Sequence, residues 1–215
     1  MELKGLSNHQ KQLLKLIANS DIATNFYFTG GTALSSVYLN HRFSEDLDFF
    51  NETEFNIEPI ILTLKTSNYD SIDIQQSFNR NLFFLKFGDE VLKLEFTYYP
   101  FPQIEHGPKI GNLEVDSLID IATNKLFTIS QKPRSRDYID LFFINKKQKL
   151  IFKDLYFRAK QKFDWHIDPL QLGSRFLEFD ESDLDMVHEK VTGSEIREFF
   201  EAEAKKFQTA ILKKA

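Results

Sequence analysis

Two aspartates separated by one residue are the side chains in this sequence best suited to chemistry. Asp46 and Asp48 lie in the run 43–50, which has the composition of a β-strand, so both carboxylates are expected on one face, with Leu47 and Phe49 on the other. Adjacent carboxylates repel each other, and a divalent cation such as Mg²⁺ or Mn²⁺ removes that cost. The same pattern also occurs at a solvated sheet edge or loop, and the spacing alone leaves both interpretations open.

A third carboxylate, Glu95, follows in another strand-like run. Alternation along residues 91–97 puts Lys93, Glu95 and Thr97 on one face, so Glu95 could lie beside the aspartate pair on a neighbouring strand. Three carboxylates can hold two metal ions about 4 Å apart, one activating an attacking hydroxyl and the other stabilising a leaving pyrophosphate. A single strand glutamate is usually a surface residue, so this assignment depends on the two aspartates.

A glycine pair precedes the acids. Gly30 and Gly31 end a short apolar run and open a helical segment, which leaves backbone N–H groups accessible to a phosphate, and Thr32 adds a hydroxyl at the same point. A plain strand-to-helix turn has the same sequence. The lysine of a Walker P-loop is missing.

The second half of the sequence contains a lysine at an unexpected place. Lys125 falls within the apolar stripe of a predicted helix, where its ammonium must snorkel or meet an anion, and a triphosphate is one such anion. Asp137 and Asp140 share a helical face. Either could pair with Lys125, contact the ribose or acceptor, or form an ion pair with Arg134 or Arg136.

The elements that must position these side chains fall into two groups. A mixed sheet with flanking helices is expected first, with helices at 7–18, 32–39 and 57–67 and strands at 26–28, 43–50, 72–74, 82–87 and 91–98. After the proline-containing stretch 100–108, helical periodicity takes over at 116–130, 135–146, 151–163, 181–190 and 194–213. We therefore expect an α+β protein with one domain in residues 1–110 and a helical domain in residues 111–215.

The composition excludes sites that depend on cysteine and gives no sign of a membrane span. The 215 residues include no cysteine, which excludes a disulfide scaffold, a thiolate zinc site and a cysteine nucleophile. No apolar run approaches the roughly 20 residues of a membrane span, so we expect no membrane partner and a cytoplasmic location.

The charge is unevenly distributed. The whole chain carries −5, but residues 125–162 hold eleven Lys/Arg and three acidic residues, a net +8, so the remainder carries −13. Seven aromatic residues are interleaved with these basic residues. This pattern fits an RNA-backbone footprint with stacking platforms, and it fits equally well a set of amphipathic helices with solvated lysines over a phenylalanine core.

Together these motifs resemble the AbiEii/AbiGii-type toxin nucleotidyltransferases, which have the polymerase-β-like nucleotidyltransferase fold. The resemblance rests on runs in matching order and spacing, covering roughly residues 26–142: Gly30-Gly31-Thr32-Ala33-Leu34, Arg42-Phe43-Ser44-x-Asp46-Leu47-Asp48-Phe49, Leu118-Ile119-Asp120-Ile121-Ala122-x-x-Lys125-Leu126 and Arg134-x-Arg136-Asp137-Tyr138-Ile139-Asp140-Leu141. The family often has serine at the position of Thr32, and an aspartate is common in this fold at the position of Glu95.

The resemblance implies an enzyme that uses Mg²⁺ or Mn²⁺ to move a nucleoside monophosphate from an NTP to an acceptor hydroxyl, expected to be RNA or a tRNA end bound through residues 125–162. Its helical domain would complete the active-site cleft, and a cognate antitoxin would restrain it in a toxin–antitoxin or phage-defence system. Alternatives are nucleotidylation of a protein or small molecule, or a non-catalytic nucleotide-binding module. The implied metal ligands are Asp46, Asp48 and Glu95, which with Lys125 and Asp137 form the catalytic set. The implied nucleotide-binding residues are Gly30, Gly31, Thr32, Arg42, Ser44, Lys125 and Asp140.

Overall fold

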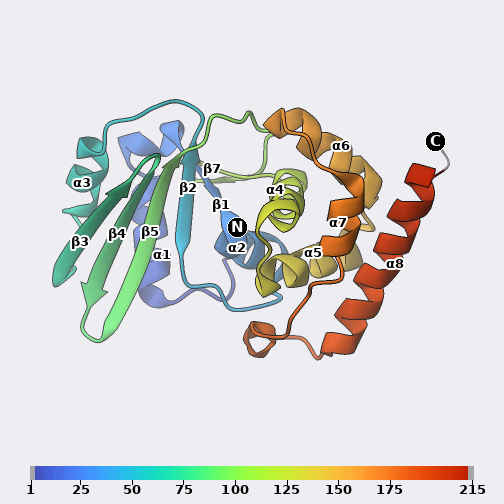
Figure 1. The fold of residues 1–215 in the computed structure, drawn as a ribbon. Coiled ribbons are helices and arrows are strands. Elements are labelled where there is room, and N and C mark those ends of the chain that lie inside the picture. Colours follow the sequence, from blue (N-terminus) through green and yellow to red (C-terminus); the bar gives the residue numbers. More distant parts are fainter. Residues whose placement is uncertain (1–2, 213–215) are drawn as a thin grey trace. The chain divides into compact units, whose positions relative to one another are not determined.

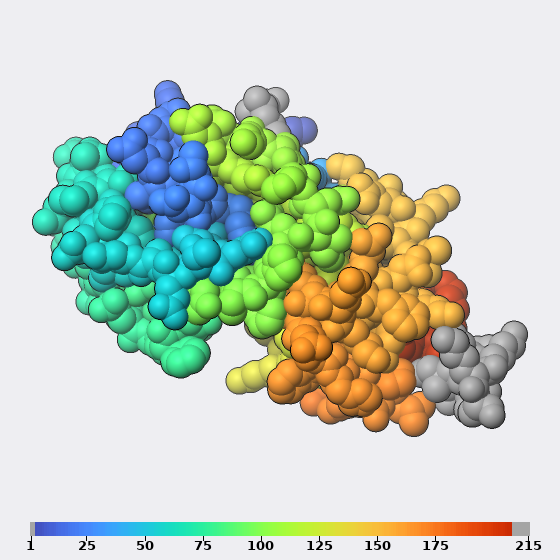
Figure 2. Space-filling model, turned by 90° about the horizontal axis from the view of Figure 1, so that it is seen from above, coloured from blue at the N-terminus to red at the C-terminus, as the bar shows by residue number. Residues whose placement is uncertain are grey.

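A computed structural model of the chain describes residues 3–212, and the side chains of residues 3–207. The chain divides into two compact units, Met1–Ser117 and Leu118–Ala215. Figure 2 shows each unit as a closely packed group of its own colours, blue to green for the first and yellow to red for the second. The boundary lies a few residues beyond the expected one.

The first unit is built on a seven-stranded mixed sheet with the order β3-β4-β5-β2-β1-β7-β6 (Figure 1). β2 runs parallel to β5 and antiparallel to β1, which is itself parallel to β7. The strands are β1 Tyr27–Thr29, β2 Leu47–Asn51, β3 Ser71–Ser77, β4 Arg80–Phe87, β5 Glu90–Tyr98, β6 Lys109–Ile110 and β7 Leu113–Val115.

One face of this sheet forms the core. Alternate residues of β2, β4 and β5 are fully buried, because period-two alternation sends their apolar side chains to the same side. Phe49 stacks on Phe96, and Phe83 meets Phe96 edge to face. Most of the strand phenylalanines are therefore explained by packing.

Helices of the first unit follow the predicted pattern. α1 (Asn8–Ala18) begins at a capping box in which Ser7 accepts from the Gln10 backbone and the Gln10 side chain accepts from the Ser7 backbone. It buries Leu13, Leu14 and Ile17. The remaining helical segments are η1 (Asp21–Asn25), α2 (Gly30–Ala33), its π-helical continuation η2 (Leu34–Leu39) and α3 (Glu58–Leu64).

The second unit is helical, with α4 (Leu118–Gln131), α5 (Ser135–Gln148), α6 (Phe152–Phe163), α7 (Pro169–Arg175), the 3₁₀ turn η3 (Leu184–Met186) and α8 (Gly193–Leu212). Position 213 of the predicted last helix lies outside the described residues. Among the described residues, no helix is long and apolar enough to cross a membrane.

Two predicted elements differ from the structure, and several short elements of the structure were not predicted. The strand expected at 43–50 begins only at Leu47, because residues 43–46 form a loop. The helix expected at 181–190 is wrong: only η3 forms there, and the Asp180 side chain accepts the N–H of Ser182, a local bond that competes with a helix. The strands β6 and β7 and the short helix α7 were not predicted. α7 begins with Asp168 as N-cap and Pro169 in its first turn.

Candidate active site

Strand register brings Asp48 and Glu95 together. In the parallel pairing of β2 with β5, Asp48 lies directly opposite Glu95, and on the other side Asp48 is opposite Thr29 of β1. Register partners share a sheet face, so both carboxylates leave the face opposite the Phe49–Phe96 core. Glu95 therefore lies beside Asp48, as the alternation along β5 predicts. Asp46 is in the loop just before β2 and is about one third exposed.

Glu95 is buried and held by three donors. Arg80 at the start of β4 donates from Nε to Oε1 and from Nη2 to Oε2, both at 2.6 Å, and Thr97 Oγ1 donates to Oε1 at 2.9 Å. Burial alone would raise the pKa of Glu95, but the hydrogen bond and charge of Arg80, helped by Thr97 and Lys93, hold it below its ordinary value. This carboxylate is therefore ionised at neutral pH.

A second cation lies among the acids. Lys93 Nζ is 2.6 Å from Asp46 Oδ2 and 4.0 Å from Glu95 Oε2, so a positive charge occupies the space between these two carboxylates. Among the residues described here, no group of three His, Cys, Asp or Glu side chains is arranged to hold a metal ion. Instead, Lys93 and Arg80 form ion pairs with Asp46 and Glu95.

The donor set nevertheless fits a hard divalent cation. Asp46, Asp48 and Glu95 contribute only oxygen ligands, the donor type that Mg²⁺ and Mn²⁺ prefer. Two of them, Asp46 and Glu95, already have a cation between them, the ammonium of Lys93. The donor chemistry of these three residues therefore fits such an ion, although their side chains, as the structure describes them, do not form a three-ligand group.

The glycine turn lies against the acids. Gly30, at φ +77°, passes so close to Asp48 that a Cβ there would collide with its carboxylate. A Cβ on Gly31 would likewise collide with the guanidinium of Arg42, whose side chain is fully buried. Both positions therefore require glycine, the first for its backbone conformation and its closeness to Asp48, the second for space alone.

Thr32, Arg42 and Ser44 shape the loop that carries Asp46. The Thr32 hydroxyl is buried, lies 2.8 Å from Ser44 Oγ and donates to the carbonyl of Asp46. Ser35, in the π-helical continuation of α2, donates its hydroxyl to the Arg42 carbonyl at 2.5 Å. The predicted phosphate-binding hydroxyl of Thr32 is thus bonded within the protein, where it fixes the approach to Asp46.

In the second unit, Lys125 meets the two predicted aspartates. Its Nζ is 2.8 Å from Asp137 Oδ1 and 2.7 Å from Asp140 Oδ2, and both aspartates have no exposed side-chain surface. Arg134 binds Asp137 through Nε at 2.9 Å and Nη2 at 3.0 Å. Burial would raise the pKa of Asp137, but the charge of Lys125 and the hydrogen bond and charge of Arg134 lower it. Both pairings considered from the sequence for Asp137, with Lys125 and with Arg134, are present together.

Two charged groups were missed by sequence reasoning. Arg80 lies 15 residues before Glu95 in the sequence, and only the register of β4 on β5 brings it near that carboxylate. Lys162 of α6 binds the fully buried Asp120 of α4 at 2.6 Å. The available signal for Lys162 was the apolar stripe of its helix, which includes Leu155 and Ala159.

The basic stretch 125–162 divides into buried and exposed parts. Lys125 and Lys162 are buried in ion pairs, while its other Lys/Arg residues reach the surface to differing degrees. Most of the interleaved aromatic side chains lie in the core, and Phe157 is exposed. The aromatics of this segment are therefore mainly core residues.

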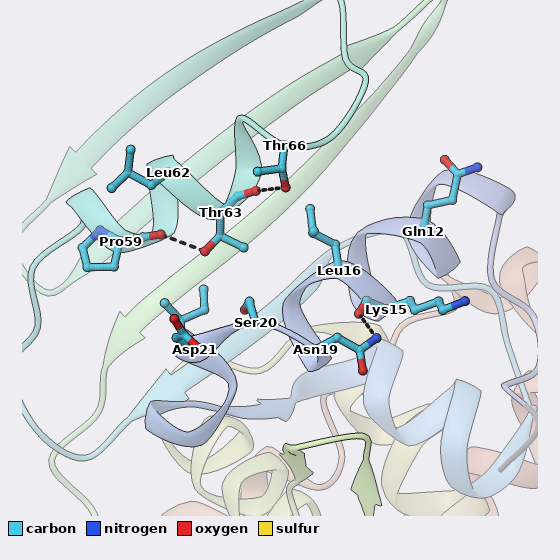
Figure 3. Close-up of a pocket in the computed structure, with 11 residues that line it drawn as sticks. Gln12, Lys15, Leu16, Asn19, Ser20, Asp21, Pro59, Leu62, Thr63 and Thr66 are labelled. Carbon is cyan, nitrogen blue, oxygen red and sulfur yellow. Dashed lines mark hydrogen bonds between the residues drawn. The ribbon is translucent and has the colours of Figure 1, made fainter.

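A groove of about 810 Å³ lies elsewhere on the first unit, between α1, η1 and α3 (Figure 3). Leu16, Ile22 and Leu62 are among its lining, and the hydroxyls of Thr63 and Thr66 are bonded to carbonyls of their own helical segment. None of the predicted site residues lines it.

Comparison with known proteins decides the family. A family model described as nucleotidyl transferase AbiEii toxin, type IV TA system, matches residues 12–213. The chain belongs to this AbiEii family. It is thus a nucleotidyltransferase, and the resemblance found in its motifs is confirmed, as is the α+β fold class.

Individual relatives are similar to this chain in sequence or in fold. An uncharacterized protein of Aquifex aeolicus (strain VF5) is 28% identical over 211 residues, which cover 95% of this chain and 98% of that protein. A solved H. pylori structure described as a candidate nucleotidyltransferase is similar in fold, with a TM-score of 0.64, 22% identity and coverage of 98% of this chain and 99% of that one. JHP933 from Helicobacter pylori gives a TM-score of 0.62, 23% identity and coverage of 97% and 96%.

Proposed function

We propose that this AbiEii nucleotidyltransferase moves a nucleoside monophosphate from an NTP to a hydroxyl of RNA, with a tRNA end as the favoured acceptor, in a reaction that depends on Mg²⁺ or Mn²⁺. The observation that carries the proposal is the pairing of Asp48 with Glu95 across parallel strands, next to Asp46 and the glycine turn. In this transfer the acceptor oxygen forms a bond to the α-phosphorus, the bond from that phosphorus to the bridging oxygen breaks, and pyrophosphate leaves. The acceptor proton passes to water, and Glu95 would help to remove it.

Each residue of the first unit has a proposed task. Asp46, Asp48 and Glu95 would hold the divalent ions, which supply charge neutralisation for the triphosphate and the departing pyrophosphate. Gly30 and Gly31 would leave room for phosphate oxygens beside Asp48. Thr32, Ser44 and Arg42 would fix the loop of Asp46, so that positioning and electrostatics provide most of the rate.

For the second unit, we propose that Lys125 and Asp137 belong to the catalytic machinery, with Asp140 supporting the nucleotide site. An ammonium has three N–H donors, and two of those of Lys125 are directed at Asp137 and Asp140. The aspartates would therefore orient the lysine, and its remaining donor would be available for a phosphate oxygen.

The biological setting is proposed from the family. The chain would act as a growth-arresting toxin in the cytoplasm, in a toxin–antitoxin or phage-defence role, with a cognate antitoxin that restrains it. The basic surface of residues 125–162 would contribute electrostatic attraction to the RNA backbone.

An acceptor-labelling experiment tests this proposal. The full-length protein is incubated with Mg²⁺, the four α-labelled NTPs and total RNA, and label on RNA is quantified. We expect Asp48→Asn to lower transfer by about 100-fold or more, because it removes an anionic ligand from the centre of the site. Asp73→Asn is the matched control, since Asp73 is an exposed carboxylate on β3 of the same sheet, and it should behave like wild type. Chelation of the metal should also stop transfer.

Other outcomes would contradict the proposal. If Asp48→Asn transferred label at the wild-type rate, the carboxylate site would have no role in the transfer reaction. Label on protein, with none on RNA, would establish protein nucleotidylation in its place. Absence of transfer to any acceptor, together with binding of NTP, would indicate a nucleotide-binding module without catalysis.

A further inference from the structure

The β3–β4 hairpin lies at the edge of the sheet (Figure 1). A fully exposed phenylalanine, Phe78, is at its tip. Ser77 pairs with Arg80, so the connection consists of Phe78 and Asn79 alone. The Phe78 side chain is 107% exposed, and its φ is +40°. It therefore makes no contribution to the core.

This position is unfavourable for phenylalanine. In a two-residue hairpin whose first residue has positive φ, glycine is preferred, and a bulky side chain there is a conformational outlier. The tip is nonetheless held firmly: Asn79 Nδ2 donates to the Tyr98 carbonyl at 2.9 Å, and the Tyr98 N–H donates to the Asn79 carbonyl at 2.8 Å. A strained aromatic residue on a fixed backbone, with no packing role, indicates a function in binding.

Strand register relates the tip to the carboxylates. Leu82, Glu95 and Asp48 form one row across β4, β5 and β2. Arg80 and Thr97 pair two residues closer to the tip, in the next row on the same face. At about 3.3 Å per residue, Phe78 lies about 13 Å along the strand from the Glu95 row. A few nucleotides of single-stranded RNA span this length.

The order of elements across the sheet indicates which substrate would pass there. The glycine turn follows β1 on one side of β2, whereas Glu95, Arg80 and the hairpin are on the other side. Attacking and leaving oxygens lie roughly in line in phosphoryl transfer, so a pyrophosphate at the glycine turn puts the acceptor on the side of β5, β4 and β3.

The side chains around the tip suit a nucleic acid. Residues 74–88 contain no aspartate or glutamate in a chain that has 32 of them, and the nearest charge to Phe78 in sequence is the cation Arg80. Amide side chains surround the tip in sequence, at Gln75, Gln76, Asn79 and Asn81. A phosphate backbone would meet no repulsion from this segment, and amides can hydrogen-bond base edges.

We propose that Phe78 is a stacking platform for a nucleobase of the acceptor RNA, a few nucleotides from the hydroxyl that reacts. This inference rests on the proposed function for the identity of the substrate. Every base has a π-face, so such a platform holds the strand without selecting a sequence. It would raise affinity for the acceptor and leave the affinity for NTP unchanged.

The test measures binding of a fluorescein-labelled 12-nucleotide single-stranded RNA to the full-length protein by anisotropy. We expect Phe78→Gly to weaken RNA binding by about 5- to 150-fold, the range for loss of one base–aromatic stack. Its melting temperature should stay the same or rise, because glycine fits positive φ. Phe78→Trp should retain affinity. Val91→Ala is the matched control, since Val91 is exposed at the opposite end of the same meander, and it should change nothing.

A second measurement tests whether Phe78 stacks on a nucleobase of the RNA or on that of the NTP. Affinity for a fluorescent NTP analogue should be equal in wild type and Phe78→Gly, and a loss confined to the NTP would assign Phe78 to the nucleotide substrate and overturn the acceptor proposal. Wild-type RNA affinity in Phe78→Gly, or no RNA binding by the wild type, would also overturn it. Asp48→Asn tests the proposed function separately, because it should abolish transfer while keeping RNA affinity.

Discussion

At the scale of residues, the buried charges of the second unit make stability depend on pH. Asp137 has no exposed surface and a lowered pKa, because Lys125 and Arg134 outweigh the effect of burial. A carboxyl whose folded pKa is depressed contributes stability that is complete above its unfolded pKa, 3.8, and is lost as pH falls through 3.8 toward the lower native value. The pKa of Glu95 is also lowered, so its contribution to stability is likewise lost as pH falls below its ordinary pKa of 4.5.

We therefore predict that Asp137→Asn costs about 3 kcal/mol at pH 7, because it leaves Lys125 and Arg134 without their shared carboxylate. As pH falls below 3.8, the difference between variant and wild type should shrink. Urea denaturation at several pH values measures both quantities. A difference that stays constant into strong acid would show that Asp137 titrates alike in the folded and unfolded chain.

The residues of the site differ in how far the sequence predicts them. Asp48 and Glu95 are predictable because alternation within each strand fixes their faces, and only one register brings the strands together. Burial of the Lys125 ammonium within an apolar stripe predicts an anionic partner, but the sequence leaves open whether Asp137, Asp140 or a triphosphate provides it. Arg80 could not be found this way, because its partner depends on the β4–β5 register and its own side chain is half exposed.

At the scale of elements, the turn from β1 into α2, the proposed phosphate site, is packed closely against neighbouring side chains. Gly31 has an ordinary φ, so the cost of a side chain there is purely steric: a Cβ would collide with Arg42 and lie 3.2 Å from Ser44 Oγ. Arg42 is fully buried and cannot turn away, so the loop of Asp46 would have to move.

We predict that Gly31→Ala destabilises the protein by about 1–3 kcal/mol, as overpacking does, and lowers nucleotidyl transfer further by displacing Asp46. Gly173→Ala is its control: no atom would lie within 4 Å of the new Cβ, and alanine favours the α7 helix by up to about 1 kcal/mol. Thermal melts and label transfer measure the two effects. Equal behaviour of the two variants would contradict the steric argument.

Elements with strong internal periodicity were predictable, and those defined by tertiary pairing were not. The meander β3–β4–β5 and helices α4, α5 and α6 follow from their patterns. β6 and β7 are two and three residues long, and β7 exists because it pairs with β1. Such short strands leave no periodic signal in a single sequence.

At the scale of the whole molecule, the proposed RNA acceptor requires that an acidic chain concentrate its positive charge on part of its surface. The net charge is −5, yet α6 presents exposed Lys153 and Arg158 next to the exposed Phe157. The two most buried lysines of the basic stretch, Lys125 and Lys162, are neutralised by aspartates and cannot attract RNA at a distance. Attraction would therefore come from surface residues such as these.

We predict that the double variant Lys153→Glu/Arg158→Glu binds single-stranded RNA more weakly than wild type. The slope of log affinity against log salt concentration should fall by about 0.7 for each RNA phosphate that the variant no longer neutralises. The control is Lys11→Glu/Lys15→Glu, which makes the same charge change at exposed positions of α1. Anisotropy titrations between 50 and 300 mM salt, about the range where screening acts, give both slopes. If both variants weaken binding equally, net charge rather than the α6 surface governs RNA affinity. An unchanged slope in the α6 variant would place the RNA on another part of the protein.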